Sequence, residues 1–252
     1  MTFSITKAFL KENIRNFWVL IANFLPALIF IIIAIFMKNV ASIDSQTLDY
    51  IVRGQFFTMT ILLTIFSLSF SNAVIYLTDK RAEQAFEWMS KTNIRFYNLF
   101  VGVGIGILIL LNSFLLLIII GFKFTTSLDL GEIINILFIS NIALIVIYPL
   151  SYVVSNFFQN GRIANSLLIP IMLILMFSIT MTDLFVTLAG NNPQDYYKFL
   201  IWNPMLFFND SLQQILGIKD NLWMSLEVYI ITLLALFLIL TIISKKTFKY
   251  LK

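Results

Sequence analysis

The residue types that usually carry out chemistry are scarce in this sequence. It contains no Cys and no His, which excludes thiolate nucleophiles, imidazole bases, axial haem ligation by histidine and the usual zinc sites. No G-x-x-x-x-G-K-[ST] phosphate loop occurs, so this chain cannot hydrolyse ATP through that motif. Gly102, Gly104 and Gly106 lack the spacing of a dinucleotide-binding fingerprint. We therefore expect no enzyme, and no metal or cofactor site, in this chain.

The charged residues that remain are concentrated in one stretch, TDKRAEQAFEWMSKTNIRFYNLF, at residues 78–100. Apolar residues recur there at helical spacing, which predicts an amphipathic helix over residues 78–95. Acids and bases are nearly balanced, whereas a signal for topology or for anionic lipid needs only Lys and Arg. With Phe86, Trp88 and Met89 in the same stretch, the pattern favours a protein-docking surface. The alternative is a solvated turn helix that only obeys the positive-inside rule.

The rest of the chain is too apolar for a water-soluble domain. Of its 252 residues 60% are hydrophobic and 12% are charged, with a mean hydropathy of +0.92. Soluble domains carry about 25% charged residues. A bilayer core of about 30 Å requires roughly 20 apolar residues per helix. The sequence thus predicts one all-α membrane domain, 1–252, with six spans at residues 17–37, 55–77, 98–121, 132–155, 165–186 and 223–243.

The distribution of basic residues predicts the orientation of these spans. Twelve of the 17 Lys and Arg residues lie in the segments that an even number of spans places on one side, together with both termini and the charged block. The positive-inside rule makes that side cytoplasmic. Residues 1–16 form an amphipathic segment without a signal-peptide cleavage site. The richness in Ile, Asn, Lys and Phe fits a bacterium with an AT-rich genome, so we expect the plasma membrane of a bacterial cell.

The segment before the last span, residues 187–222, is the longest one expected outside the cell. It is too short to fold as a separate domain. Its stretches LFVTLAG, YYKFLIW and MLFFNDSLQQILGI are apolar enough to lie on or dip into the membrane surface. We therefore expect short interfacial or re-entrant helices there.

Polar groups inside the predicted spans are few. Asp183 and Glu227 stand near outer ends of spans, where snorkelling or pairing is the expected role. No acid pair is expected in mid-membrane, which argues against a proton-driven antiporter. Gly102 and Gly106 follow the small-xxx-small pattern that lets helices approach closely. That pattern fits either packing within the subunit or a dimer contact.

The layout resembles the permease subunits of ABC transporters of the ABC-2 type. The resemblance rests on the block DKRAEQAFEWMSKTNIRFYNLFVGVGIG, the outer segment WNPMLFFNDSLQ, and an amphipathic N-terminal helix followed by six spans. The chain departs from the family pattern at Gln84-Ala85, where Gly-Thr is frequent, and at Lys91-Thr92, where Pro is frequent. The resemblance in overall layout extends over essentially the whole chain.

This resemblance implies a role for the charged block. The block would be a coupling helix seated in a cleft of a separate ATP-binding subunit, and residues 1–16 would be a connecting helix that steadies the same contact. Its acids would meet basic residues of the ATPase, while its large apolar side chains would be the anchor. The coupling residues so implied are Asp79, Glu83, Phe86, Glu87, Trp88 and Met89.

The resemblance also implies an assembly and a transport route. Two ATP-binding subunits would hold ATP and Mg, and the permease would pair with a second copy or a sister permease. Spans 2 and 5 would line the route, which makes Ser71, Asn72, Ser178 and Thr182 the pathway candidates. The expected substrate is a hydrophobic or amphipathic compound, such as a membrane-active peptide, an antibiotic or a lipid-like molecule, moved outward. We expect no nucleic-acid partner.

Two other classes of function fit the sequence. A secondary transporter without ATP would require a buried ionisable residue or inverted repeats, and neither is evident in the sequence. A membrane-embedded immunity protein that binds a toxin without transporting it is also compatible with the composition. A neighbouring gene with a phosphate-loop motif would count against the immunity protein.

Overall fold

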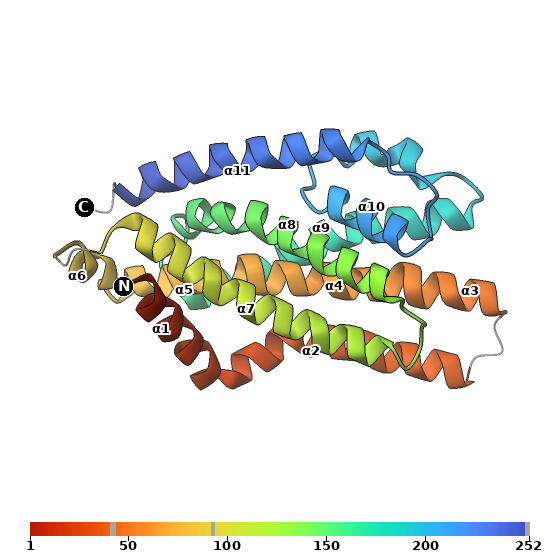
Figure 1. Ribbon diagram of the computed structural model, residues 1–252, viewed down its shortest axis with the longest axis horizontal. Helices are drawn as coiled ribbons and strands as arrows, with labels where there is room; N and C mark the ends of the chain where they lie inside the picture. Colours follow the sequence, from red (N-terminus) through yellow and green to blue (C-terminus); the bar gives the residue numbers. More distant parts are fainter. Residues whose placement is uncertain (41–43, 92–93, 250–252) are drawn as a thin grey trace.

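A computed structural model describes residues 1–252 apart from 41–43, 92–93 and 250–252. Every regular element in the described part is a helix, and most helices run along the long axis of the molecule (Figure 1). In chain order they are α1 (Thr2–Arg15), α2 (Phe17–Val40), α3 (Ser45–Asp49), η1 (Tyr50–Phe57), α4 (Thr58–Ile65), η2 (Phe66–Ser71), α5 (Asn72–Ala82), α6 (Ala85–Lys91), α7 (Phe96–Phe122), α8 (Leu130–Ser155), α9 (Gly161–Leu188), η3 (Pro193–Phe199), α10 (Leu206–Ile215) and α11 (Leu226–Lys249).

Five helices of the described part are long and apolar enough to cross a membrane, judged by length and composition. They are Thr47–Ala82, Phe96–Phe122, Leu130–Ser155, Gly161–Leu188 and Leu226–Thr247. The first predicted span falls on α2, where the apolar helix found among the described residues is shorter, Phe24–Asn39. The chain is therefore an all-helical, membrane-embedded protein with five spanning candidates, where the sequence predicts six spans.

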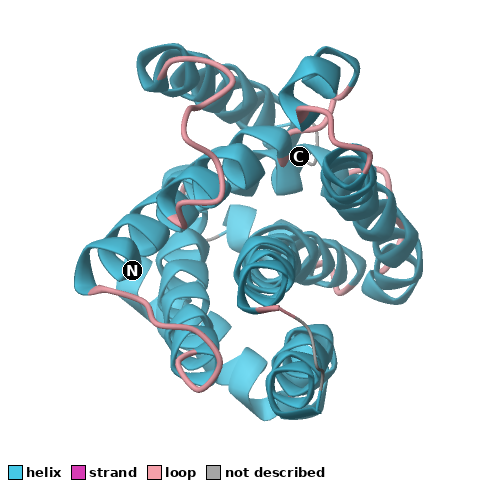
Figure 2. Ribbon diagram, turned by 90° about the vertical axis from the view of Figure 1, so that its right-hand side faces the viewer, coloured by secondary structure: helices cyan, strands magenta, loops and turns pink. Residues whose placement is uncertain are grey.

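One continuous helix, Thr47–Ala82, forms the centre of the bundle. Of the residues in its most apolar 18-residue stretch, 94% are buried. The corresponding share is 11% for Leu226–Thr247 at the periphery. Viewed along the long axis, the other helices surround a central one (Figure 2). Because every face of this helix is covered, Ser67, Ser69 and Ser71 are all buried although their alternation puts them on different faces. The polar residues in this buried stretch therefore face the interior of the chain.

The central helix is not uniformly α-helical. The segments η1 and η2 are π-type, with backbone hydrogen bonds that reach one residue further than in an α-helix. The intervening α4 and the following α5 are ordinary α-helix. The helix therefore contains two wide turns, one near its beginning and one near its middle.

The segment 187–222 contains two short helices, η3 and α10, as the sequence predicts. All of residues 206–213 are buried, and α10 packs against α8 and α4 instead of lying flat on a surface. Asn192 caps η3 by accepting a hydrogen bond from the backbone of Gln194. This segment therefore folds back into the bundle.

The start of α1, the helix α6 and the end of α11 lie at one end of the molecule (Figure 1). The other end carries α3, α10 and the connections before α11. At that end Arg53 of η1 forms an ion pair with Glu132 of α8. Asp129 and Glu132 form a reciprocal capping box at the start of α8.

Candidate functional site

The charged block forms a helix end, a turn and a short helix, where the sequence predicts one helix over 78–95. The central helix ends at Ala82, and α6 begins at Ala85. Between them Gln84 adopts φ 57°, the left-handed conformation that ends a right-handed helix. The change of direction allows Phe86 to pack back onto the bundle. The sequence pattern does not reveal this turn because Gln is not a residue type typical of left-handed positions.

Asp79 contacts the chain itself. Its Oδ1 accepts a hydrogen bond from the backbone N of Gly161, at the start of α9, at 2.8 Å. A Cβ atom on Gly161 would lie 2.5 Å from the oxygens of Asp79, so only glycine allows this approach. The negative charge also stands where the dipole of α9 favours it. Asp79 therefore joins the central helix to α9.

Lys80 and Arg81 join the charged block to two further helices, α1 and α8. Lys80 Nζ pairs with Glu12 of α1 at 3.0 Å and with Glu83 at 2.9 Å. Arg81 donates to the carbonyl oxygen of Ser155 at 2.7 Å and to Oδ1 of Asn156 at 2.7 Å, at the end of α8. The exposed ion pairs contribute little stability. The bond to Ser155 satisfies a backbone carbonyl group that the end of α8 leaves without a helical partner.

The apolar residues of the block are turned inward where the structure describes them. Phe86 is 7% exposed and lies beside a small cavity lined by Arg81, Tyr152 and Ser244. Met89 is partly buried against the core, and the side chain of Trp88 lies outside the described residues. The exposed residues of the block include Glu83, Gln84, Glu87 and Lys91.

The glycine stripe of α7 is filled by α1 of the same chain. A Cβ on Gly102 would lie 2.9 Å from Ile5, and one on Gly106 would lie 2.4 Å from the ring of Phe9. Thr6 Oγ1 donates to the carbonyl oxygen of Gly102 at 2.8 Å. Of the two uses that the pattern allows, the structure therefore shows close packing within the subunit.

The four pathway candidates fall into two separate places. Asn72 Nδ2 donates to Oδ1 of Asn13 in α1 at 2.9 Å, and Ser71 lines a cavity of about 180 Å³. That cavity lies between α2, the central helix and the first half of α9, with Asn165 in its wall.

The other two candidates lie on the second half of α9. Ser178 accepts a hydrogen bond from Nδ2 of Asn203 at 2.9 Å. Thr182 donates to the carbonyl oxygen of Ser178 at 2.7 Å. The structure therefore does not bring the two pairs together into one path within this chain.

A buried charged cluster at the α10 end was missed by the sequence reasoning. Lys219 Nζ lies 3.5 Å from Oδ1 of Asp183 and 3.6 Å from Oδ1 of Asp210, and it donates to the hydroxyl of Tyr197. The Tyr197 hydroxyl in turn donates to Asp183 at 2.7 Å. Asp183 is 1% exposed and Asp210 is not exposed at all. The expected pairing of Asp183 is present, but its partners lie 14 to 36 residues away, where no sequence spacing could point to them.

Burial and the nearby charge of Asp183 raise the pKa of Tyr197 well above its usual value of 10. Its hydroxyl is therefore neutral at physiological pH and remains a donor to Asp183. Among the residues that the structure describes, no group of three or more His, Cys, Asp or Glu side chains could hold a metal ion.

No protein-family model matches this sequence, and no curated protein matches it either.

Proposed function

We propose that this chain is the membrane-spanning subunit of an ATP-driven transporter of the ABC-2 kind. The observation that carries the proposal is the number of helices tied to residues 79–86. Asp79 bonds to α9, Lys80 pairs with α1, and Arg81 bonds to the end of α8. Phe86 and Ser244 of α11 line the same small cavity. A force applied to α6 would pass through the turn at Gln84 to the end of α5, whose contacts reach α9, α1 and α8, while Phe86 itself lies near α11. Transmission to several helices is the property that a coupling element needs.

The proposed contact surface differs from the set that the resemblance implies. Asp79 and Phe86 are engaged within the subunit, so they would transmit force from the contact instead of forming it. Glu83, Gln84, Glu87 and Lys91 are exposed on α6 and its preceding turn, although Glu83 also pairs with Lys80. We assign the contact with the ATP-binding subunit to these four residues.

In the proposed assembly, α2 is the sixth crossing and both termini are cytoplasmic. Two copies of the chain, or this chain and a sister permease, recruit two ATP-binding subunits that hold ATP and Mg in the plasma membrane of a bacterium. The substrate is a hydrophobic or amphipathic compound moved outward. The broad exposed apolar surfaces of α9 and α11 support contacts with lipid, with a second copy and with such a substrate.

A second candidate function is transport without ATP. The observation in its favour is the buried cluster of Asp183, Asp210 and Lys219, because buried ionisable groups are typical of transporters coupled to ions. We rank it second because Asp183 stands close to the end of α9.

The test is purification of the tagged chain in mild detergent, expressed with its neighbouring genes, followed by mass spectrometry and an ATPase assay. We expect a subunit with a phosphate loop to copurify and hydrolyse ATP. Reversal of two exposed charges, Glu83→Lys with Glu87→Lys, should release it. Asp195→Lys with Glu227→Lys is the matched control, since it makes the same charge change at exposed sites away from α6.

Two results would contradict the proposal. One is a chain that purifies without any ATPase although it is fully inserted and folded. The other is an ATPase that stays bound when Glu83 and Glu87 are reversed. In the first case, loss of gradient-driven uptake in an Asp183→Asn variant would favour the second candidate.

A further inference from the structure

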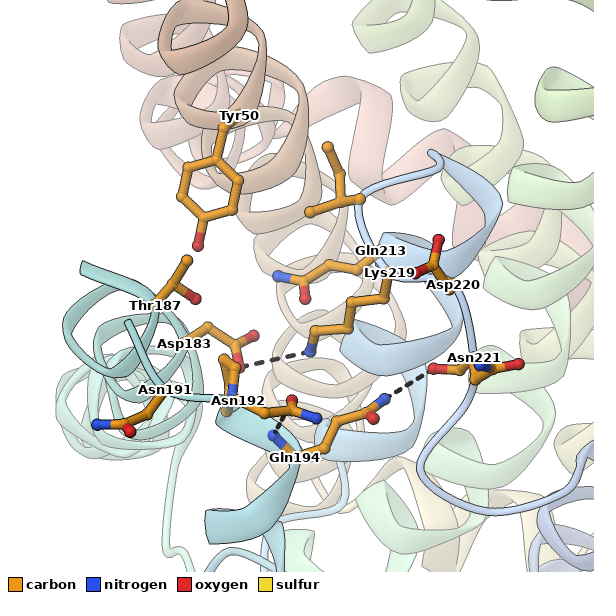
Figure 3. A pocket seen from close by; sticks show the side chains of 12 residues that line it. Tyr50, Asp183, Thr187, Asn191, Asn192, Gln194, Gln213, Lys219, Asp220 and Asn221 are labelled. Atoms are coloured by element: carbon orange, nitrogen blue, oxygen red, sulfur yellow. Dashed lines mark hydrogen bonds and ion pairs between the residues drawn. The ribbon is translucent and has the colours of Figure 1, made fainter. Parts of the chain in front are cut away.

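A polar cavity of about 300 Å³ opens beside the buried charged cluster (Figure 3). Its wall combines the end of α9, the start of η3, the end of α10 and the following loop, with Tyr50 of η1 opposite. Asn191, Asn192 and Asp220 are exposed at its rim, so the cavity communicates with the surface. Its volume is at the lower limit for ligand sites, which suits a small group and not a whole amphipathic molecule.

The charges around the cavity do not balance. Asp183 and Asp210 are both buried and share one cation, Lys219. Asp220 adds a further negative charge at the rim. Buried charges are stable only when they are paired. By formal charge the cluster holds one more carboxylate than ammonium group. The carboxylates also accept hydrogen bonds from Tyr197, Asn209 and Tyr229, and a cation in the cavity would balance the remaining negative charge.

Lys219 is not available to bind an anion. An ammonium group has three N–H donors. Nζ of Lys219 donates to the Tyr197 hydroxyl and to Asp183, and Asp210 lies 3.6 Å away as its second ion-pair partner. An incoming carboxylate or phosphate would have to compete with two buried carboxylates for this lysine.

An acceptor in the wall has no partner. Gln213 is 2% exposed and lines the cavity, yet its Oε1 receives no hydrogen bond. In Figure 3 its amide lies beside the side chain of Lys219, on the side of the cavity that faces Asp183. A buried acceptor without a donor costs about 1 to 3 kcal/mol. A donor from a ligand would remove that cost.

We propose that this cavity binds a primary ammonium group at the end of a short alkyl chain. Its N–H groups would donate to Oε1 of Gln213 and to the Asp183 carboxylate, and its charge would balance the cluster. The group could belong to a small amine or to the aminoethyl headgroup of a lipid. Binding requires only this chain, so the inference does not depend on the proposed contact with an ATPase.

The test is calorimetric titration of n-butylamine into the full chain reconstituted in phosphatidylcholine nanodiscs. We expect binding of butylamine, and neither butyrate nor tetramethylammonium should bind, since the first is an anion and the second has no N–H donor. Gln213→Met should weaken binding about tenfold or more, because a hydrogen bond to a charged group is lost. Gln214→Met is the matched control, because Gln214 is the adjacent residue and does not line the cavity.

The Gln213→Met variant is expected to fold, because Oε1 has no partner to lose inside the chain. A second variant, Gln213→Lys, carries its own ammonium group into the cavity and should abolish butylamine binding. No binding to the wild type, or equal binding to the wild type and Gln213→Met, would overturn the proposal.

Nanodiscs of phosphatidylethanolamine distinguish the two sources of the group. If this lipid weakens butylamine binding to the wild type and leaves the residual binding of Gln213→Met unchanged, the headgroup occupies the cavity. If binding is the same in both lipids, the natural ligand is a soluble amine. Either result supports an ammonium site.

Discussion

Several residues that the sequence marks as candidates for partner binding have partners within the chain. Asp79 is an acid near the start of a charged helix, which is typical of a docking residue. Its hydrogen-bond partner, Gly161, is 82 residues away. A single sequence cannot show that contact, whereas the helical periodicity around Asp79 could be read directly. At the residue scale, the sequence thus shows the type of side chain but does not show its partner.

The first prediction concerns Asp79. Asp79→Ala should lower the free energy of unfolding by about 1 to 2 kcal/mol, because the start of α9 loses a charged hydrogen-bond partner. The measurement is the melting temperature of the chain in mild detergent. Glu83→Ala is the control, because Glu83 is an exposed acid four residues along the chain, and this variant should melt like the wild type. Equal melting of the two variants would contradict the role of Asp79.

The second prediction concerns Tyr197 and pH. In the unfolded chain this tyrosine ionises near its usual pKa of 10, whereas in the folded chain its pKa is raised. Its contribution to stability is therefore complete below about pH 10 and declines as the pH rises further. Tyr197→Phe should cost about 1 to 3 kcal/mol at neutral pH, because buried Asp183 loses a donor.

The measurement is the melting temperature of the wild type and Tyr197→Phe between pH 8 and 11. The difference between the two proteins should stay constant up to about pH 10 and become smaller above it. A difference that is unchanged over the whole range would show that Tyr197 does not ionise differently in the folded chain.

At the scale of elements, the positions of the helices followed from the sequence. Each of the six predicted apolar segments falls on a long helix, because runs of about 20 apolar residues have few other structures available in a bilayer. The short helices of residues 187–222 were also predicted. The break at Gln84 was not predicted, because it depends on the tertiary packing of Phe86.

The third prediction concerns the contact between α1 and α7. Gly106→Ala should destabilise the chain by about 1 to 3 kcal/mol, because its methyl group would overlap the buried ring of Phe9. Gly131→Ala is the matched control, since the nearest atom to its Cβ would be 3.4 Å away, near the exposed start of α8. It should be neutral or stabilising, because alanine favours helix over glycine. Melting temperatures in detergent test both changes, and equal effects would contradict the packing argument.

At the scale of the whole molecule, the burial of the central helix could not be foreseen. The sequence shows that residues 55–77 are apolar and rich in Ser and Thr, and the helix that contains them has the lowest mean hydropathy of the spanning candidates. It does not show which helices cover this segment. The structure shows that Ser71 and Asn72 lie inside a single chain. The buried cluster of Asp183, Asp210 and Lys219 was missed for the same reason, since it is assembled from separate helices and a loop.

The fourth prediction concerns topology. The chain has no cysteine, so a single introduced cysteine reports on one site alone. Two exposed positions are suitable: Gln84, in the turn before α6, and Asp220, at the rim of the cavity. The variants are Gln84→Cys and Asp220→Cys. In intact cells an impermeant maleimide should label Asp220→Cys and not Gln84→Cys, and permeabilisation should expose both. Labelling of both variants in intact cells would contradict the proposed orientation.

Lys7→Cys extends the same measurement to the N-terminus. If α2 crosses the membrane as proposed, residue 7 and residue 84 lie on the same side, and both should be protected in intact cells. Labelling of residue 7 alone would show that α2 does not cross.

The two wide turns of the central helix have a geometric consequence. The helix of 36 residues would be about 50 Å long at 1.5 Å per residue, so it reaches from Tyr50 at the cavity to Arg81 beside α6. If one π-type turn tightened into α-helix, everything beyond it would rotate by about 100° and shift by about 1.5 Å. A single backbone rearrangement in η2 would thus rotate α5 about its axis. The rotation would change which side chains α5 presents to α8 and α9 without unfolding either end of the helix.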